Sequence, residues 1–200
     1  MYLWRTLTEE QRKEALKYRR LQKYPKHCPP HFDSTESVKY LVTAACYEHK
    51  KIIGHSHNRM TDFEAALLEL CNSMAQNIFA WCILPNHYHV YLRTDEMGAL
   101  RKAIGKLHGQ TSFAWNGTDR ERGRKVWHNC FERKISSEGH HFATINYVLN
   151  NPIHHGYAEK WRDWPWSNAD AYLKELGENR AAEIWKKYPI LDYGKKWDIY

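Results

Sequence analysis

Cysteine is scarce in this chain, and its spacing excludes the usual cysteine-built scaffolds. The 200 residues include five cysteines, an odd number, and no two of them form a C-x-x-C pair. A disulfide-stapled secreted domain or a cysteine zinc ribbon needs paired spacings that are absent here. Three of the five lie within apolar patterns, so we expect small buried side chains in a reducing compartment. The five are Cys28, Cys46, Cys71, Cys82 and Cys130.

Long apolar runs are also absent. No stretch reaches the roughly 18 apolar residues that a membrane-spanning helix needs, and the N-terminus shows no signal-peptide pattern. We therefore expect a cytoplasmic protein that has no membrane partner. The sequence has no internal repeat, no low-complexity tract and no P-loop. Its length fits one domain with appendages better than two domains.

Positive charge is what the chain has in excess. The 30 Lys and Arg residues oppose 23 Asp and Glu residues, which gives a formal net charge of +7 before any of the 13 histidines is counted. Such a surplus favours a polyanionic partner, although many basic soluble proteins bind no nucleic acid. Aromatic residues make up 14% of the chain and include nine Trp, which argues against disorder and supplies surfaces on which bases could stack.

The N-terminal segment, residues 1–36, differs from the rest in composition. Residues 7–24 have the pattern of a charged helix with a thin apolar stripe, and Thr8-x-x-Gln11 resembles a capping box at its start. The Pro-rich stretch PKHCPPHFDS that follows is the expected linker.

The middle segment, residues 37–158, alternates between strand-like and helix-like patterns. β-branched and aromatic runs predict strands, and apolar residues at three- and four-residue steps predict helices. In chain order we expect a strand over 38–47, a helix over 62–77 opened by Thr61-x-x-Glu64, strands over 79–84 and 87–94, a helix over 97–114, a basic loop over 116–125 and a strand over 126–135. This β-α-β-β-α-β order predicts an α+β domain of the ferredoxin-like (RRM-like) type, an antiparallel sheet with helices on one face.

Further helices are expected after the sheet. One covers about residues 139–151 and should end at Asn151-Pro152. The C-terminal tail, residues 159–200, contains helices near 167–177 and 179–187 and is expected to pack on the domain. Its motif WRDWPW is interpreted as the packing element that fixes the tail.

Two histidines lie two residues apart in the run ILPNHYHVYL. His87 and His89 share one face of the expected strand, about 7 Å apart along the backbone. Tyr88, Val90 and Leu92 take the other face and should point into the core, so the histidine row should point away from it. Two imidazoles at this spacing can converge on one metal ion, but two surface histidines on a sheet would give the same pattern.

A tyrosine on the later helix lies off that helix's apolar stripe. On a helical projection Phe142, Ile145 and Leu149 gather on one side, whereas Tyr147 and Asn151 lie on another, one turn apart. The helix thereby offers a hydroxyl nucleophile and an amide oxygen side by side. The alternative is a tyrosine that packs on the sheet and keeps its hydroxyl in water.

The segments PNHYHV and YVLNNPIHHGY resemble the HUH motif and the tyrosine-helix motif of REP-associated tyrosine transposases, which belong to the single-tyrosine HUH, or IS200-like, transposases. The segments TAACYEHKKIIG, FAWCILPNHYHV, LHGQTSFAWNG, RKVW and DWPWSNADAYL also look like that family, in its order. The resemblance covers about residues 38–175. It implies that residues 37–158 form the catalytic domain and that the terminal segments are additions.

The resemblance also implies roles for four residues. His87 and His89 would be metal ligands, Asn151 would give the third ligand, and Tyr147 would be the nucleophile. The cofactor would be a divalent metal, Mg²⁺ or Mn²⁺, with tighter binding of Mn²⁺ because imidazoles suit that ion better. The implied activity is a DNA transposase-type single-strand endonuclease and strand transferase. It would act on hairpin single-stranded DNA from palindromic repeats through a 5′-phosphotyrosine intermediate, as a monomer or a homodimer.

Basic and aromatic side chains give candidate DNA contacts, or else a solvated loop and core tryptophans. Trp115 could stack on a base, whereas Trp81 and Trp127 are interpreted as core residues because they lie within strands. His154 and His155 follow the expected helix break and should be solvated or contact phosphate. The candidate phosphate contacts in the basic loop are Arg120, Arg122, Arg124 and Lys125.

Three other functions fit parts of the same sequence pattern. A ferredoxin-like sheet can hold nucleic acid without cutting it, as RRM domains do, although the RRM aromatic signature is absent. An HUH replication-initiator-like nuclease often has two tyrosines or a third histidine, and additional helicase domains for which this chain is too short. A structural zinc site would need four ligands, and the sequence offers no convincing second pair.

Overall fold

The computed structural model describes residues 38–191 and Tyr193, together with Thr8, Glu10, Glu14 and Lys17. The expected linker and most of the expected N-terminal helix lie outside these residues. No helix in this described part of the chain is long and apolar enough to cross a membrane.

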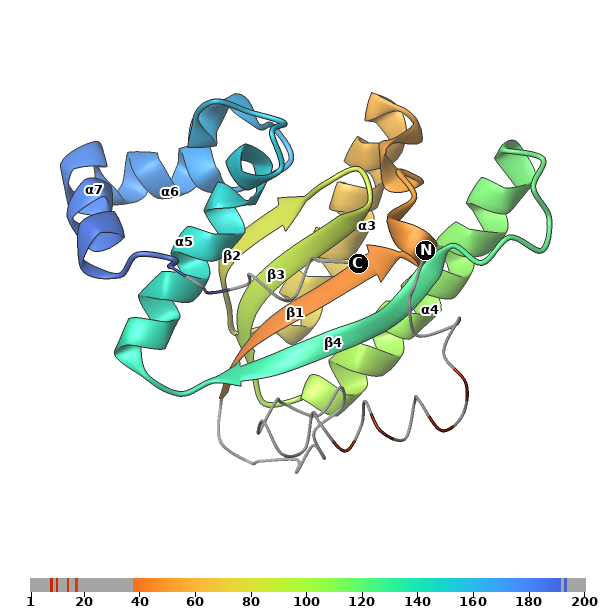
Figure 1. The fold of residues 1–200 in the computed structure, drawn as a ribbon, viewed down its shortest axis with the longest axis horizontal. Helices are drawn as coiled ribbons and strands as arrows, with labels where there is room; N and C mark the ends of the chain where they lie inside the picture. The colour runs from red at the N-terminus through yellow and green to blue at the C-terminus, as the bar shows by residue number, and fades with distance from the viewer. Residues whose placement is uncertain are drawn as a thin grey trace.

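Four strands form one antiparallel sheet (Figure 1). They are β1 (Val38–Cys46), β2 (Asn77–Ile83), β3 (His87–Thr94) and β4 (Trp127–Ile135), in the spatial order β2-β3-β1-β4. Helix α3 (His57–Met74) follows β1, and helix α4 (Met97–Thr118) follows β3. Because β1 pairs antiparallel with both β3 and β4, the chain has the predicted ferredoxin-like arrangement.

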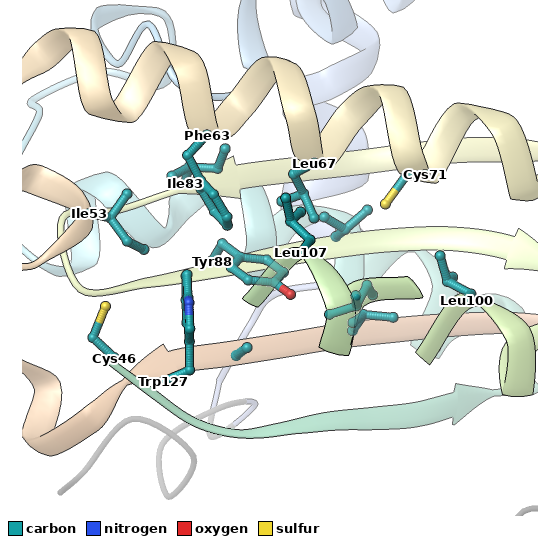
Figure 2. Close-up of a cluster of buried hydrophobic side chains, with 14 of the residues drawn as sticks. Cys46, Ile53, Phe63, Leu67, Cys71, Ile83, Tyr88, Leu100, Leu107 and Trp127 are labelled. Atoms are coloured by element: carbon teal, nitrogen blue, oxygen red, sulfur yellow. The ribbon is translucent and has the colours of Figure 1, made fainter. Parts of the chain in front are cut away.

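Helices α3 and α4 cover one face of the sheet and enclose the first hydrophobic core (Figure 2). At the centre, the ring of Phe63 on α3 lies 5.5 Å from the ring of Tyr88 and 5.3 Å from that of Trp127. These are ordinary distances for favourable aromatic contacts. Trp127 is therefore a core residue, as its place in a strand predicted. Trp115 is only 9% exposed in the same core, so the expectation that it stacks on a base was wrong.

Helix α3 begins at His57, earlier than the predicted residue 62. Ser56 has extended backbone angles, and its hydroxyl accepts a hydrogen bond from the amide of Arg59 at 3.2 Å. This bond satisfies one of the free amides at a helix start, which is the role of an N-cap residue. Thr61 lies inside the helix, so the Thr61-x-x-Glu64 pattern was wrong as a start signal.

Helix α5 (Glu138–His154) packs on the opposite face of the sheet, against β2 and β3 (Figure 1). A second core forms between them, with Leu41, Tyr91, Val148 and Leu149 among its buried residues. The sheet therefore has a hydrophobic core on both faces. The prediction that the histidine row of β3 points away from the core was wrong in this respect, because that row faces the second core.

The C-terminal tail packs beside α5 through helices α6 (Ala169–Leu176) and α7 (Glu178–Lys187). The indole of Trp164 donates a hydrogen bond to the carbonyl of Ile83 at 2.9 Å, and the amide of Ile83 donates to the carbonyl of Trp166 at 2.9 Å. The WRDWPW motif thus joins the tail to the end of β2, as its interpretation as a packing element predicted.

Helix α5 continues through Pro152 to His154, so the predicted end at residue 151 was wrong. Proline cannot donate the helical bond to the carbonyl four residues earlier, and this usually ends or kinks a helix. Here the chain stays helical for two more residues. The amide of His155 then donates to the carbonyl of Asn151 at 3.0 Å, and Gly156 with φ = 71° ends the helix. Pro152 itself is buried, and this burial offsets part of the cost of the missing bond.

Candidate active site

Strand β3 brings His87 and His89 together on the face that α5 covers. Their ring centroids lie 5.1 Å apart, and the two side chains are 3% and 0% exposed. The alternation of strand side chains explains the arrangement, since Tyr88 between them enters the first core. The alternative of two surface histidines on a sheet is therefore wrong. Burying a polar ring costs free energy unless its nitrogens have hydrogen-bond or metal partners.

The outer nitrogen of each imidazole has a defined partner. Asn86 donates from Nδ2 to the carbonyl of His49 at 3.3 Å, which turns its Oδ1 toward Nδ1 of His87 at 2.8 Å. Thr43 on the neighbouring strand β1 places its hydroxyl 2.7 Å from Nδ1 of His89. Both rings are held through Nδ1, so both present Nε2 to the space beneath α5. Such outer contacts are what fix the ring orientation of metal-binding histidines.

Helix α5 places Tyr147 and Asn151 opposite these nitrogens. Asn151 Oδ1 lies 3.2 Å from Nε2 of His87, and the Tyr147 hydroxyl lies 3.5 Å from Nε2 of His89. Tyr147 is 4% exposed and Asn151 1% exposed. The structure therefore brings together all four residues that the HUH and tyrosine-helix motifs singled out.

The donor set at this point suits a cation. Since Asn86 presents an acceptor to Nδ1 of His87, that nitrogen donates, and in the neutral imidazole Nε2 keeps its lone pair. Asn151 donates from Nδ2 to the carbonyl of Tyr147 at 3.1 Å, so the atom that it turns toward His87 is also an acceptor. Two facing lone pairs repel each other unless a positive charge lies between them. Two imidazole nitrogens and an amide oxygen match the ligand types of Mn²⁺ and similar ions.

The group of His87, His89 and Asn151 differs from commoner metal sites in its third donor. Among the described residues, no three side chains of His, Cys, Asp or Glu come together as a metal-binding group. The third donor here is a neutral amide. A site of two imidazoles and an amide leaves the full positive charge of a divalent ion available to an anionic ligand such as phosphate.

Two further residues lie close to Tyr147 and were not predicted from the sequence. The ring of Tyr193 lies 5.5 Å from that of Tyr147, and its hydroxyl bonds Thr144 at 2.6 Å. Arg133 of β4 is opposite Leu41 in the strand register and so lies on the α5 face. Burial lowers the pKa of Arg133, while Tyr193 and Tyr147 oppose that effect, so a guanidinium lies within electrostatic reach of both phenols.

His155 also belongs to the site, on the side of His87. Its ring lies 5.0 Å from that of His87, and it is half-buried, whereas His154 is exposed. The four-residue steps from Tyr147 to Asn151 to His155 were the available signal, because they continue one helix face. The predicted helix end at residue 151 left His155 off this face, so only a solvated or phosphate-contacting role was expected for it.

The basic loop between α4 and β4 lies at the same end of the sheet as His87. Its strand partner gives the position: Trp127 at the start of β4 pairs with Cys46, and Ala45 pairs with His87. Arg124 donates to Asp119 at 2.7 Å and to Asn116 at 2.9 Å, so it holds the loop together. The exposed basic residues of the loop are Arg120, Arg122 and Lys125.

The chain is similar to known proteins in sequence and in fold. A family described as Transposase IS200 like matches residues 34–151, more than half of the chain. A Haemophilus influenzae protein described as a candidate REP-associated tyrosine transposase is 24% identical over 168 residues, which are 76% of this chain and 94% of that protein. A solved REP-associated tyrosine transposase bound to a REP hairpin has a TM-score of 0.55 at 15% identity, covering 76% of this chain and 87% of that one, which shows a common fold. The chain belongs to the IS200-like transposase family, as its HUH and tyrosine-helix segments predicted.

Proposed function

We propose that this transposase is a metal-dependent single-strand DNA endonuclease and strand transferase in which Tyr147 is the nucleophile. The observation that carries the proposal is the meeting of a hydroxyl and three metal-type donors from two separate elements. Tyr147 lies 3.5 Å from His89, and Asn151 lies 3.2 Å from His87. A purely structural role gives no reason for these four side chains to converge in a buried space.

Tyr147 would attack the phosphorus of the scissile phosphodiester. A bond forms between phosphorus and the phenolic oxygen, and the bond from phosphorus to the 3′ oxygen breaks. The phenol releases its proton to water, and the departing 3′ oxygen takes one up, which leaves a 5′-phosphotyrosine and a free 3′-hydroxyl. A phenol ionises much more readily than an alkyl alcohol, with an ordinary pKa of about 10, so less activation is needed.

The same chemistry explains why a tyrosine suits strand transfer. A phenolate is a competent leaving group, so a 3′-hydroxyl can attack the phosphotyrosine and rejoin two strands without ATP. A nuclease that only degrades DNA gains nothing from this reversibility. The burial of Tyr147 supports the idea, because a water-poor site protects a covalent intermediate from hydrolysis.

His87, His89 and Asn151 would hold the divalent cation, Mg²⁺ or Mn²⁺. When bound there, such an ion supplies Lewis-acid stabilisation of charge on the phosphate. The protein's own contribution is orientation. Asn86 and Thr43 hold the two imidazoles, and the bond from Asn151 to the Tyr147 carbonyl keeps the amide oxygen turned inward.

We propose that the substrate is hairpin single-stranded DNA. The enzyme would act in the cytoplasm, as a monomer or a homodimer. One solved structure of the same fold is bound to a REP hairpin. In this chain, the exposed Arg120, Arg122 and Lys125 lie at the end of the sheet where the histidines lie. Phosphate contacts from such side chains provide salt-dependent affinity.

A denaturing gel tests the proposal. Purified protein is mixed with 5′- or 3′-labelled hairpin DNA from the flanks of its own gene, with Mn²⁺, Mg²⁺ or EDTA, beside Tyr147→Phe. We expect a metal-dependent covalent band that holds the DNA on the 3′ side of the break and is lost in the variant. Binding without any covalent band, across several flanking hairpins and both metals, would instead support a non-catalytic nucleic-acid-binding module.

A further inference from the structure

An exposed phenylalanine, Phe113, lies near the end of α4, the helix that packs on the face of the sheet opposite to α5 and its Tyr147. Phe113 is 73% exposed, one of two large hydrophobic side chains with high exposure among the described residues, the other being Leu191. Phe113 touches neither core and gains nothing from burial. A single exposed apolar side chain is common on protein surfaces, so its neighbours decide whether it has a role.

An arginine from the basic loop is built onto this ring. The guanidinium carbon of Arg122 lies 4.7 Å from the ring centroid of Phe113, and Nη1 of Arg122 donates to the Phe113 carbonyl at 3.0 Å. Gly117, one turn further along the helix, leaves space for the guanidinium of Arg122. A Cβ there would lie 2.7 Å from Nη2 of Arg122, so a larger residue would push the guanidinium aside.

The loop that presents Arg122 is held in place by buried polar contacts. Asn116 is 7% exposed, and its side chain donates to the carbonyl of Arg124 at 2.7 Å. Asp119 accepts from Arg59 of α3 at 3.0 Å and from Arg124 at 2.7 Å. The Arg59 guanidinium holds the pKa of the Asp119 carboxyl well below its usual range, so this anchor stays charged at neutral pH. Such preorganisation reduces the entropy lost when a ligand binds.

The charge around the ring identifies the kind of partner. Lys106 and Lys102 are exposed and lie seven and eleven residues before Phe113, respectively, within about 20° of it on the helical projection. Loop residues 119–125 add four cations, Arg120, Arg122, Arg124 and Lys125, against two acids, Asp119 and Glu121. A row of cations that ends in a flat aromatic ring suits phosphates followed by an unpaired base.

The size of the patch argues against a protein partner. A specific protein interface buries about 800 Å² on each side around an apolar centre. Here one aromatic ring is surrounded by lysine and arginine side chains. A nucleobase needs only one exposed ring face, because every base has a π-face on which it can stack.

We propose that Phe113 and Arg122 form a platform that stacks one unpaired base of single-stranded DNA, separate from the site of Tyr147. The ring would supply the stacking surface, Arg122 would support the ring and contact the adjoining phosphate, and Lys102 and Lys106 would follow the strand along α4. The inference rests on the proposed action on single-stranded DNA, but it does not require that Tyr147 cut.

Binding measurements with the full chain test this inference. Fluorescence anisotropy gives Kd for two labelled probes: a flanking hairpin with single-stranded extensions, and the same hairpin trimmed to its stem and loop. We expect Phe113→Ala to weaken binding of the extended probe about 10-fold, within the range for one stacked base, and Phe113→Trp to restore it. The trimmed hairpin should bind both variants like the unchanged protein. Leu191→Ala, which removes the other highly exposed hydrophobic side chain, is the matched control and should change neither Kd.

Two outcomes overturn the proposal. Equal Kd values for Phe113→Ala and the unchanged protein on the extended probe would show that no base stacks on Phe113. If Phe113→Ala changes the oligomeric state measured by light scattering but not the Kd for the extended probe, the ring contacts a second copy of the chain instead. The covalent gel separates this inference from the proposed function, since a protein that forms no covalent band can still show the Phe113-dependent difference between the two probes.

Discussion

The amide oxygen of Asn151 lies 3.2 Å from Nε2 of His87, and the hydrogen bonds on the far side of each group turn two acceptors toward each other. Left to themselves, two such groups would rotate until one donated to the other. The contacts with Asn86 and with the Tyr147 carbonyl prevent that rotation. Two acceptors that repel each other, and that a cation between them would attract, are the main support for the proposed metal-assisted chemistry.

Thr43 should control metal affinity without touching the metal. Its hydroxyl lies 2.7 Å from Nδ1 of His89, so Thr43→Val removes the partner that orients this ring while keeping the side-chain volume. We expect the affinity for Mn²⁺ to fall about 10- to 100-fold, measured by isothermal titration. Thr43→Ser retains the hydroxyl and should bind Mn²⁺ within a few-fold of the unchanged protein. Equal affinity for the valine variant would show that the hydroxyl does not position His89.

Gly54 should be needed for the turn that precedes His87. Its amide donates to the carbonyl of Pro85 at 2.9 Å, and a Cβ on Gly54 would lie 2.4 Å from Cβ of Pro85 and 2.8 Å from its Cα. Because proline cannot move aside like a flexible side chain, Gly54→Ala should destabilise the protein by about 1–3 kcal/mol and reduce activity.

Gly105 provides the opposite case and the control for Gly54. It lies in the middle of α4, and a Cβ there would meet nothing within 4 Å. Gly105→Ala should raise the free energy of unfolding by about 0.5–1 kcal/mol, because alanine loses less backbone entropy in a helix. Urea unfolding of both variants measures the difference. A Gly54→Ala protein as stable as Gly105→Ala would contradict the packing described for the turn.

Acid should destabilise the protein through His108. This ring stacks on Trp127 at 4.1 Å and bonds the Tyr88 hydroxyl at 3.1 Å, and burial lowers its pKa from 6.5 to about 4. Above pH 6.5 the ring is neutral in both the folded and the unfolded chain. As the pH falls from 6.5 toward 4, His108 binds a proton in the unfolded chain but not in the folded protein. The free energy of unfolding therefore decreases across this window.

Urea unfolding at pH 7 and pH 5 checks the sign. The loss due to His108 should be about 2 kcal/mol between these two values. Burial also lowers the pKa of His141 to about 4, which adds a loss in the same direction. His108→Gln should therefore make the dependence shallower without abolishing it. A variant that is as steep as the unchanged protein would show that His108 is not the group responsible.

The order of strands and helices along the chain, and the pairs of site residues that share a face, could be predicted from the sequence because each rests on a local signal. The alternation in HYHVYLRT predicted both ends of β3 correctly, and the four-residue step from Tyr147 to Asn151 predicted that they share a helix face. Short-range periodicity is set by backbone geometry, so it can be read without the fold.

What the sequence did not predict depends on contacts between distant segments. Tyr147 looked partly solvent-facing on its helix, yet it is 4% exposed, since Tyr193 from the end of the chain lies against it. Thr43 and Arg133 belong to the site only through strand pairing across β1, β3 and β4. The passage of α5 through Pro152 was likewise unforeseen, because tertiary burial there outweighs the local cost of proline.

The central claim is that Tyr147 and no other residue becomes linked to DNA. Mass spectrometry of the covalent complex after protease and nuclease digestion tests it most directly. The chain has 13 tyrosines, and Tyr193 lies beside Tyr147 with a ring separation of 5.5 Å, so the residue must be located in the peptide itself. The proposed mechanism predicts a nucleotide joined through its 5′ phosphate to the peptide that contains Tyr147. A nucleotide on Tyr193, or on a residue outside α5, would contradict it.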